Sequence, residues 1–127
     1  MKTILKNCKL ITPPFSEEKL YDIFIEGGLI ADIGENLHVE DAKELDLDGH
    51  VVLPGFIDMH CNICEPGFEN IEDISTVSRS AARGGFTSIT CEPNTKPVID
   101  NKTVVEYIIS KSKAQASVNI YPYGSMS

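Results

Sequence analysis

From residue 55 onward the sequence alternates short apolar segments with longer amphipathic ones, and this alternation constrains the fold more than any other feature. Short apolar runs bounded by glycine or proline are typical of strands, whereas apolar residues spaced three and four apart are typical of helices. The expected order is strand 55–59, helix about 71–83, strand 86–91, helix about 101–115 and strand 118–122. Such an order is typical of parallel βαβ units, so an α/β fold is predicted for this half.

The ends of the predicted helices carry recognisable signals. Gly84-Gly85 is expected to end the first helix, because glycine readily adopts the backbone conformation that follows a helix C-terminus. Asp100 or Asn101 is expected to cap the second helix through a side-chain oxygen. The predicted buried stripe of the second helix is Val104, Val105, Ile108 and Ile109.

The first 53 residues contain only strand and turn patterns. Segments 22–26 and 29–33 flank a Gly-Gly pair, which predicts a two-residue hairpin because glycine tolerates the positive φ of such turns. Further strands are expected at 3–11, 44–48 and 50–53. Pro13-Pro14 is expected to stop the first of them.

Charge and hydropathy exclude some classes of partner. The 127 residues carry a formal net charge of −8 without a basic stripe, so nucleic-acid binding is not expected. The sequence has neither a long apolar run nor a signal-peptide pattern, so we expect a cytoplasmic protein that does not enter a membrane. In that compartment the four cysteines are expected to be thiols rather than disulfides.

Residues 54–67, PGFIDMHCNICEPG, carry the candidate chemistry. They predict a short buried strand that leads into His60. Side chains two positions apart point the same way from a strand, so Asp58, His60, Asn62 and Cys64 share one side if strand geometry continues that far. A hydrolytic metal site on a strand end needs imidazoles at two such positions, and here one of the two is Asn62.

This segment resembles the dihydroorotase branch of the amidohydrolase superfamily, whose pattern is Pro-Gly-Phe-Ile-Asp-x-His-x-His-x-Arg-x-Pro-Gly. The matching residues are Pro54, Gly55, Phe56, Ile57, Asp58, His60, Pro66 and Gly67. The chain departs at Asn62, where the family has its second metal-binding His, and at Cys64, where the family has Arg. The resemblance continues through EPNTKPVIDN (92–101) and NIYPYGS (119–125), and covers most of residues 50–125.

The resemblance implies a metal-dependent hydrolase domain folded as a TIM-type (β/α)8 barrel, which needs about 250 residues. The expected fold is therefore α/β: N-terminal β-sandwich-like strands (1–53), then the first βα units of the barrel (54–127), incomplete in this chain. We expect either an oligomer or a missing C-terminal remainder to complete it.

The resemblance also implies a role for each residue at the strand ends. His60 would be a zinc ligand, and Asn62 would stand at the position of another ligand. Cys64 would replace the Arg that grips a substrate carboxylate, although a thiol has neither its charge nor its fork of donors. Asn94 would contact the substrate, and Asp58 would orient the metal ligands from behind. No catalytic residue is assigned, because the proton-transferring Asp of the family comes from a later strand.

Each of these roles has a structural alternative. His60 is either a ligand or a buried side chain bonded to neighbouring backbone, and Asn62 is either a weak oxygen donor or a structural amide. Asn94 follows a proline and is equally suited to a turn. Asp58 is equally suited to a hydrogen bond with backbone near the strand end.

Three functions remain open from the sequence. The first is hydrolysis of a small cyclic amide of pyrimidine biosynthesis by metal-activated hydroxide, with a degenerate metal site that leaves the 127-residue chain inactive alone. The second is an inactive homologue that supports a partner enzyme. The third is a metal or thiol module built from Cys61, Cys64, Cys91 and His60. Alternation of Cys61 and Cys64 to opposite faces speaks against this third function.

Overall fold

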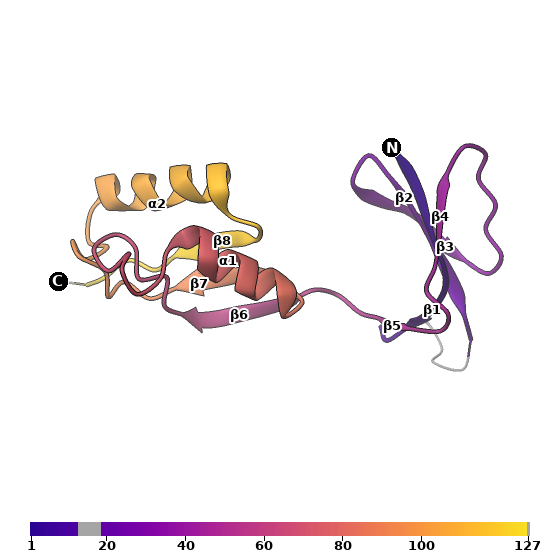
Figure 1. Ribbon diagram of the computed structural model, residues 1–127, viewed down its shortest axis with the longest axis horizontal. Helices are drawn as coiled ribbons and strands as arrows, with labels where there is room; N and C mark the ends of the chain where they lie inside the picture. Colours follow the sequence, from indigo (N-terminus) through magenta and orange to yellow (C-terminus); the bar gives the residue numbers. More distant parts are fainter. Residues whose placement is uncertain (13–18, 127) are drawn as a thin grey trace. The chain divides into compact units, whose positions relative to one another are not determined.

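The computed structural model describes residues 1–12 and 19–126. The chain forms two compact units, Met1–Pro54 and Gly55–Ser127 (Figure 1). The described residues of the first unit form strands and turns, and those of the second alternate strands with helices, so the fold is α/β. The predicted strand stop at Pro13-Pro14 lies outside the described residues.

In the first unit, the described residues form a five-stranded sheet of order β3-β2-β1-β4, with β5 paired to the end of β1. The strands are β1 (Lys2–Leu10), β2 (Tyr21–Glu26), β3 (Leu29–Gly34), β4 (Lys43–Asp46) and β5 (Val51–Val52). Strands β2 and β3 form the predicted antiparallel hairpin, which turns at Gly27 and Gly28 with φ of 62° and 83°. Each strand predicted in this half is confirmed, with slightly different ends.

A buried ion pair stabilises the first unit beside its apolar core. The buried apolar residues of this core are Cys8, Leu10 and Ile23. Asp22 is only 3% exposed, and its carboxylate accepts hydrogen bonds from Lys6 Nζ at 2.6 Å and from the Leu37 N–H at 2.9 Å. A buried carboxylate is tolerated when such donors replace water, and here they tie the segment after β3 to β1 and β2.

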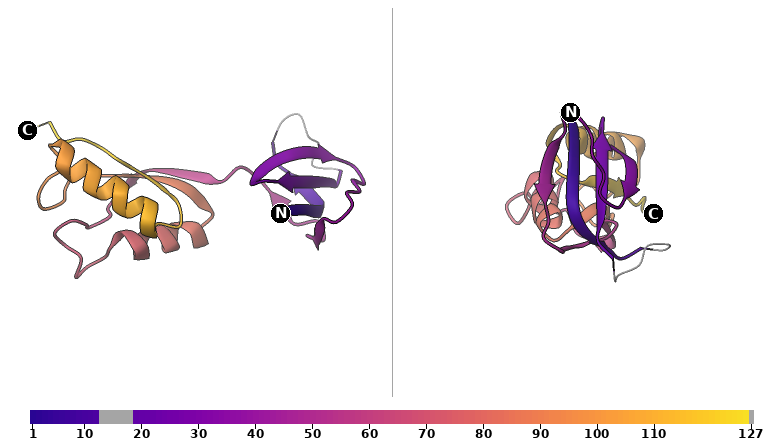
Figure 2. Two further views of the ribbon diagram at one scale, coloured as in Figure 1. Left: turned by 90° about the horizontal axis from the view of Figure 1, so that it is seen from above. Right: turned by 90° about the vertical axis from the view of Figure 1, so that its right-hand side faces the viewer.

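In the second unit, the described residues form a three-stranded parallel sheet of order β6-β7-β8. Its elements are β6 (Phe56–Cys61), α1 (Ile74–Arg83), β7 (Phe86–Cys91), α2 (Lys102–Gln115) and β8 (Asn119–Pro122). Helices α1 and α2 run beside these strands in Figure 1 and in the views of Figure 2. A single apolar cluster joins α1, β7, α2 and β8, which confirms the predicted βαβ order.

Local signals set the helix ends. Asp73 caps α1 and its side chain accepts from the Thr76 N–H, while the Thr76 hydroxyl accepts from the Asp73 N–H. This capping box begins the helix at Ile74. The predicted start, at about residue 71, was therefore about three residues too early. Gly84 ends α1 and Asn101 caps α2, both as predicted.

Two burial predictions are wrong. Strand β6 is an edge strand of the described sheet, and Ile57 and Met59 are 66% and 70% exposed instead of buried. On α2, Ile108 is fully buried but Ile109 is 37% exposed. Ile109 borders a groove of about 270 Å³ beside β8, which is the other edge of the described sheet. Both exceptions occur where no further element of the described chain covers an apolar side chain.

Candidate functional site

His60 and Glu92 meet at the C-terminal ends of neighbouring parallel strands. His60 is the penultimate residue of β6, and Glu92 directly follows β7. Imidazole Nδ1 lies 3.2 Å from the Glu92 carboxylate, and the two side chains are 80% and 30% exposed. The alternative of a buried histidine bonded to backbone is therefore wrong. Because its Nδ1 faces a carboxylate, the Nε2 atom of His60 is the nitrogen left for a ligand.

Asn62 and Asn94 form a second contact, two residues beyond His60 and Glu92 respectively. Asn94 Nδ2 donates a 2.6 Å hydrogen bond to Asn62 Oδ1. Both residues are exposed, and both lie in loops that follow the strands. The structure thus brings Asn62 and Asn94 together, and it places His60 at the end of the strand that precedes Asn62. The structure also places Glu92 in the candidate site, which sequence reasoning missed. Its position directly after β7 was the sequence signal that could have indicated this.

Asp58 and Cys64 do not join this set. The Asp58 carboxylate accepts the backbone N–H of His60 at 2.9 Å, which is the alternative of a backbone hydrogen bond near the strand end. Cys64 has a positive φ of 56°, and its carbonyl accepts the Phe68 N–H at 2.8 Å. Strand geometry ends at Cys61, so Cys64 is not in register with the side chains before it.

The cysteines differ in burial, and within the described residues they form no metal-binding group. Cys8, Cys61, Cys64 and Cys91 are free thiols. Cys61 and Cys91 are register partners across β6 and β7, and burial raises the pKa of Cys91 to about 12. Cys91 is fully buried in the core, whereas His60 points to solvent. Within residues 1–12 and 19–126, no three His, Cys, Asp or Glu side chains are placed to hold a metal ion.

The donors at these strand ends do not fit zinc by themselves. A catalytic zinc site takes three protein ligands, usually imidazoles, carboxylates or thiolates. Here, among the described strand-end residues, only one imidazole is present, with its Nε2 left for a ligand, and the amide oxygen of Asn62 already accepts a hydrogen bond. An amide oxygen is moreover a hard, neutral donor that suits calcium better than zinc.

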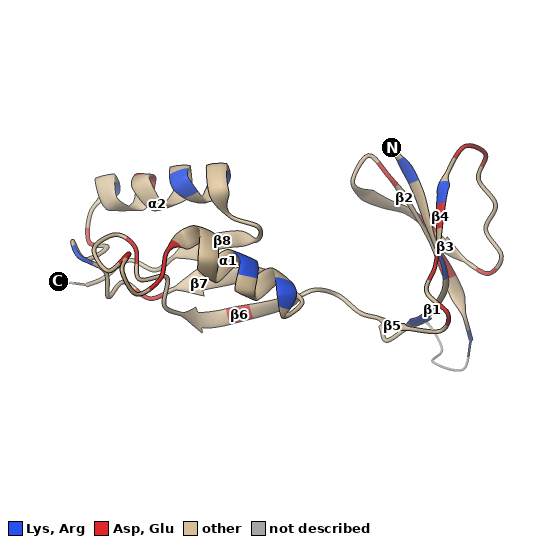
Figure 3. Ribbon diagram, viewed as in Figure 1, with Lys and Arg blue, Asp and Glu red and all other residues tan. Residues whose placement is uncertain are grey.

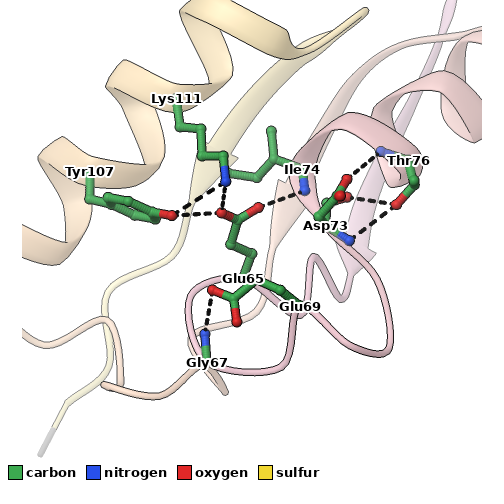
Figure 4. A network of polar contacts seen from close by, with 8 residues as sticks. All are labelled: Glu65, Gly67, Glu69, Asp73, Ile74, Thr76, Tyr107 and Lys111. Carbon is green, nitrogen blue, oxygen red and sulfur yellow. Dashed lines mark hydrogen bonds and ion pairs between the residues drawn. The ribbon is translucent and has the colours of Figure 1, made fainter.

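Sequence reasoning missed the buried carboxylate of Glu65, which organises the loop after β6 (Figure 4). Its side chain is fully buried, and it accepts hydrogen bonds from Tyr107 OH at 2.6 Å, from Lys111 Nζ, and from the Ile74 N–H at 3.0 Å. Burial, the largest single influence, raises the pKa of Glu65, but these donors together outweigh it and lower that pKa. The available signal was the four-residue spacing of Tyr107 and Lys111, which places both on one face of a helix.

The loops after β6 and β7 are packed against each other. The Lys96 N–H donates to the Pro66 carbonyl at 2.8 Å. Gly67 has a φ of +105°, and a Cβ atom there would lie 2.2 Å from the Lys96 carbonyl oxygen. A side chain at position 67 would therefore push the loops apart, and glycine is required for this approach.

Acidic residues gather along these same loops (Figure 3). They are Glu65, Glu69, Glu72, Asp73, Glu92 and Asp100. The arginines of α1, Arg79 and Arg83, are exposed on that helix, and Arg83 lies in its last turn. An anionic ligand at the strand ends would thus meet mainly negative charge, with Lys96 as a nearby exception.

Parallel βαβ units that follow an N-terminal β unit, with polar side chains at the carboxyl ends of the strands, match the start of a TIM-type barrel. Residues 49–127 match the family described as dihydro-orotase-like, and the chain belongs to this family. The predicted resemblance is thus confirmed.

Curated relatives are similar over nearly the whole chain. The dihydroorotase of Acetivibrio thermocellus is 45% identical over 124 residues, which are 98% of this chain and 29% of the relative. The dihydroorotase of Geobacter sulfurreducens is 45% identical over 127 residues, 99% of this chain and 30% of the relative. The chain therefore spans less than a third of the length of these relatives.

Solved structures of hydantoinases share the fold. The L-hydantoinase (dihydropyrimidinase) of Arthrobacter aurescens superposes with a TM-score of 0.84 at 28% identity, covering 96% of this chain and 27% of that one. A D-hydantoinase gives a TM-score of 0.77 at 27% identity, covering 100% of this chain and 28% of that one.

Neither α1 nor α2 has the length and apolar character of a membrane span, within the described residues.

Proposed function

We propose that this chain belongs to a cytoplasmic amidohydrolase of dihydroorotase type whose metal centre is degenerate. The substrate class is a small cyclic amide of pyrimidine biosynthesis. Family membership and the similarity to hydantoinases support the class of reaction. The observation that carries the degenerate centre is the engagement of Asn62 Oδ1 by Asn94 Nδ2 at 2.6 Å. At this position the resemblance places an imidazole nitrogen that would be free to bind zinc.

The roles of the strand-end residues follow from this proposal. His60 retains a ligand position through Nε2, and Asn62 replaces a ligand with an occupied amide. Asn94 keeps the substrate-contacting position, although its Nδ2 donor is directed to Asn62. Cys64 leaves the substrate carboxylate without an arginine, and Asp58 fixes the backbone at His60. No hydrolytic step is assigned to these residues acting alone.

Further βα units are required beside β8, from the remainder of a barrel or from another chain. The exposed side chains of Ile109 and Tyr121, at 37% and 56%, border the groove at this edge. Apolar surface of this kind is normally covered in a soluble enzyme. The complete enzyme is thus larger than the described sheet.

A second candidate function is an inactive homologue that supports a partner enzyme. The acidic character of the loops after β6 and β7 favours it, because a substrate carboxylate would be repelled there. The site has also lost both a metal ligand and the substrate-binding arginine. An inactive homologue would not need either residue.

Cobalt(II) titration of the 127-residue chain tests the degenerate centre, because tetrahedral cobalt bound to nitrogen and oxygen ligands absorbs visible light. The unchanged chain is expected to show no tetrahedral band, whereas Asn62→His is expected to bind at least about tenfold more tightly. Asn70→His is the matched control, since Asn70 is an exposed residue of the same loop. The proposal would be refuted if the unchanged chain bound cobalt(II) through Asn62 as tightly as Asn62→His does.

Activity separates the two candidate functions. In the complete reading frame that contains this chain, Asn62→His together with Cys64→Arg is expected to raise the rate of dihydroorotate hydrolysis above that of the unchanged protein. Dihydroorotate hydrolysis by the unchanged full-length protein would exclude the second candidate function, an inactive homologue. Zinc-dependent turnover by the isolated 127-residue chain would contradict the proposal of a degenerate metal centre. A restored protein that stays inactive would favour the inactive homologue.

A further inference from the structure

The segment that carries Asn62 and Cys64 is held by two buried side chains that alternate with them. Ile63 and Glu65 are both 0% exposed, whereas Asn62 is exposed and Cys64 is half-buried. Ile63 belongs to the apolar core between the sheet and the helices. An apolar contact fixes how deeply a segment is buried but not its direction, because the hydrophobic effect is non-directional.

Glu65 supplies the direction that Ile63 does not. Its two carboxylate oxygens accept from three donors at fixed places: the first N–H of α1 and two side chains one turn apart on α2 (Figure 4). Hydrogen bonds weaken steeply when their angle departs from linearity, so three donors from two helices specify one orientation of the carboxylate. Charge-assisted bonds of this kind are also the stronger ones.

The same loop then contacts the loop after β7. Pro66 accepts from the Lys96 N–H, and Gly67 packs on the Lys96 carbonyl. Two residues before Lys96 lies Asn94, the donor to Asn62. The buried carboxylate, the contact between loops and the amide bridge therefore form one continuous series of contacts.

We propose that Glu65 is a positioning residue of the candidate site, and that Tyr107 and Lys111 of α2 set the position of Asn62 relative to Asn94 through it. The proposal rests on the proposed function only for the statement that these amides belong to the site. The arrangement makes α2 part of the support of the strand ends, although no residue of α2 lies in the loops that carry them.

Nuclear magnetic resonance of the 127-residue chain tests this without metal or substrate. The side-chain NH2 group of Asn94 should exchange slowly with solvent, because one proton is held by Asn62 Oδ1. In Glu65→Gln this exchange is expected to become roughly twofold faster, because a neutral hydrogen bond between two exposed amides gives only modest protection. The Phe68 and Lys96 backbone N–H groups should lose protection with it, while those of β7 stay protected.

Variants of α2 separate positioning from a general loss of stability. Lys111→Arg keeps the charge and should keep slow Asn94 exchange, whereas Lys111→Met should lose it. Glu106→Gln is the control, since Glu106 makes a surface pair with Lys102 at 3.5 Å on the same helix. Unchanged Asn94 exchange in folded Glu65→Gln would overturn the proposal.

If Glu65→Gln does not fold, Tyr107→Phe replaces it, because this variant keeps the donors from Lys111 and Ile74. Faster Asn94 exchange in Tyr107→Phe would support the proposal, and unchanged exchange in both Tyr107→Phe and Lys111→Met would overturn it. These outcomes do not depend on cobalt binding by Asn62→His. The positioning role and the degenerate centre can therefore fail separately.

Discussion

Asn94 Nδ2 donates a 2.6 Å hydrogen bond to Asn62 Oδ1, and this bond joins the loop after β6 to the loop after β7. The acceptor is the one side-chain oxygen of Asn62, and this is the atom with which an amide would bind a cation. The same bond therefore links two loops and occupies a potential ligand.

A double-mutant cycle with Asn62→Ala and Asn94→Ala measures this bond. Both residues are exposed, so we expect a coupling free energy of only about 0.5 kcal/mol. Amide exchange of β7 under native conditions gives the free energy of unfolding of the second unit for each variant. Additive effects of the two substitutions would show that the amides do not interact in solution.

The buried carboxylate of Glu65 predicts that the second unit loses stability in acid. Its donors lower the pKa below the ordinary value of 4.5, so the unfolded chain binds the proton more readily. The contribution of Glu65 is complete above that value and is lost as the pH falls through the lowered pKa. The titratable groups that face it are the charged Lys111 and the neutral Tyr107 of α2, each with a raised pKa. Asp73 at the start of α1 also has a lowered pKa, because it accepts hydrogen bonds from Thr76.

Amide exchange of β7 in the unchanged chain and in Glu65→Gln, at neutral and acid pH, checks this prediction. The variant should be less stable at neutral pH and should lose less stability on acidification. Asp22→Asn is the matched control, because Asp22 is a buried carboxylate of the first unit, paired with Lys6. An equal loss of stability in acid for the unchanged chain and Glu65→Gln would contradict the prediction.

Adjacent isoleucines of α2 should differ sharply in their contribution to stability. Ile108 is 0% exposed in the core of the second unit, and Ile109 is 37% exposed. Ile108→Ala removes buried methyl groups and leaves a cavity, so it should lower the free energy of unfolding by about 2–5 kcal/mol. Ile109→Ala should cost less than about 1 kcal/mol in the isolated chain. Urea unfolding followed by tyrosine fluorescence compares the variants, and similar losses would refute the packing described.

The thiol of Cys91 should resist alkylation in the folded chain. Burial raises its pKa to about 12, and the thiolate is the reactive species. Iodoacetamide at pH 8 followed by mass spectrometry should modify Cys91 at least about a hundredfold more slowly than in urea. Equal labelling of Cys91 in both states would contradict its burial, and release of zinc on unfolding would favour the cysteine and histidine module.

Several features of the fold could be predicted because neighbouring residues determine them. The glycine pair turns the β2–β3 hairpin, Asn101 caps α2, and Gly84 ends α1, each through conformations or hydrogen bonds of a few successive residues. Strand β7 lies at the predicted residues, because a short apolar run between glycine and a proline-bearing loop is typical of a strand. His60, Asn62 and Asn94 lie at one edge of the sheet because the carboxyl ends of parallel strands lie together there.

Other features depended on residues far apart in the chain. Cys64 leaves strand geometry, with a φ of 56°, directly before the fully buried Glu65. Burial of Glu65 in turn requires Tyr107 and Lys111, more than forty residues later. No local pattern distinguishes such a glutamate from one exposed in a loop.

The sequence by itself determined the order of strands and helices, the helix ends, the family, and the amide where a second imidazole is expected. The tertiary structure decided that Glu92 faces His60, that Asn94 occupies the oxygen of Asn62, and that a buried carboxylate supports their loops. The physical reason is range: turns and caps arise within a few residues, whereas burial and ion pairing depend on which distant segments the folded chain brings together.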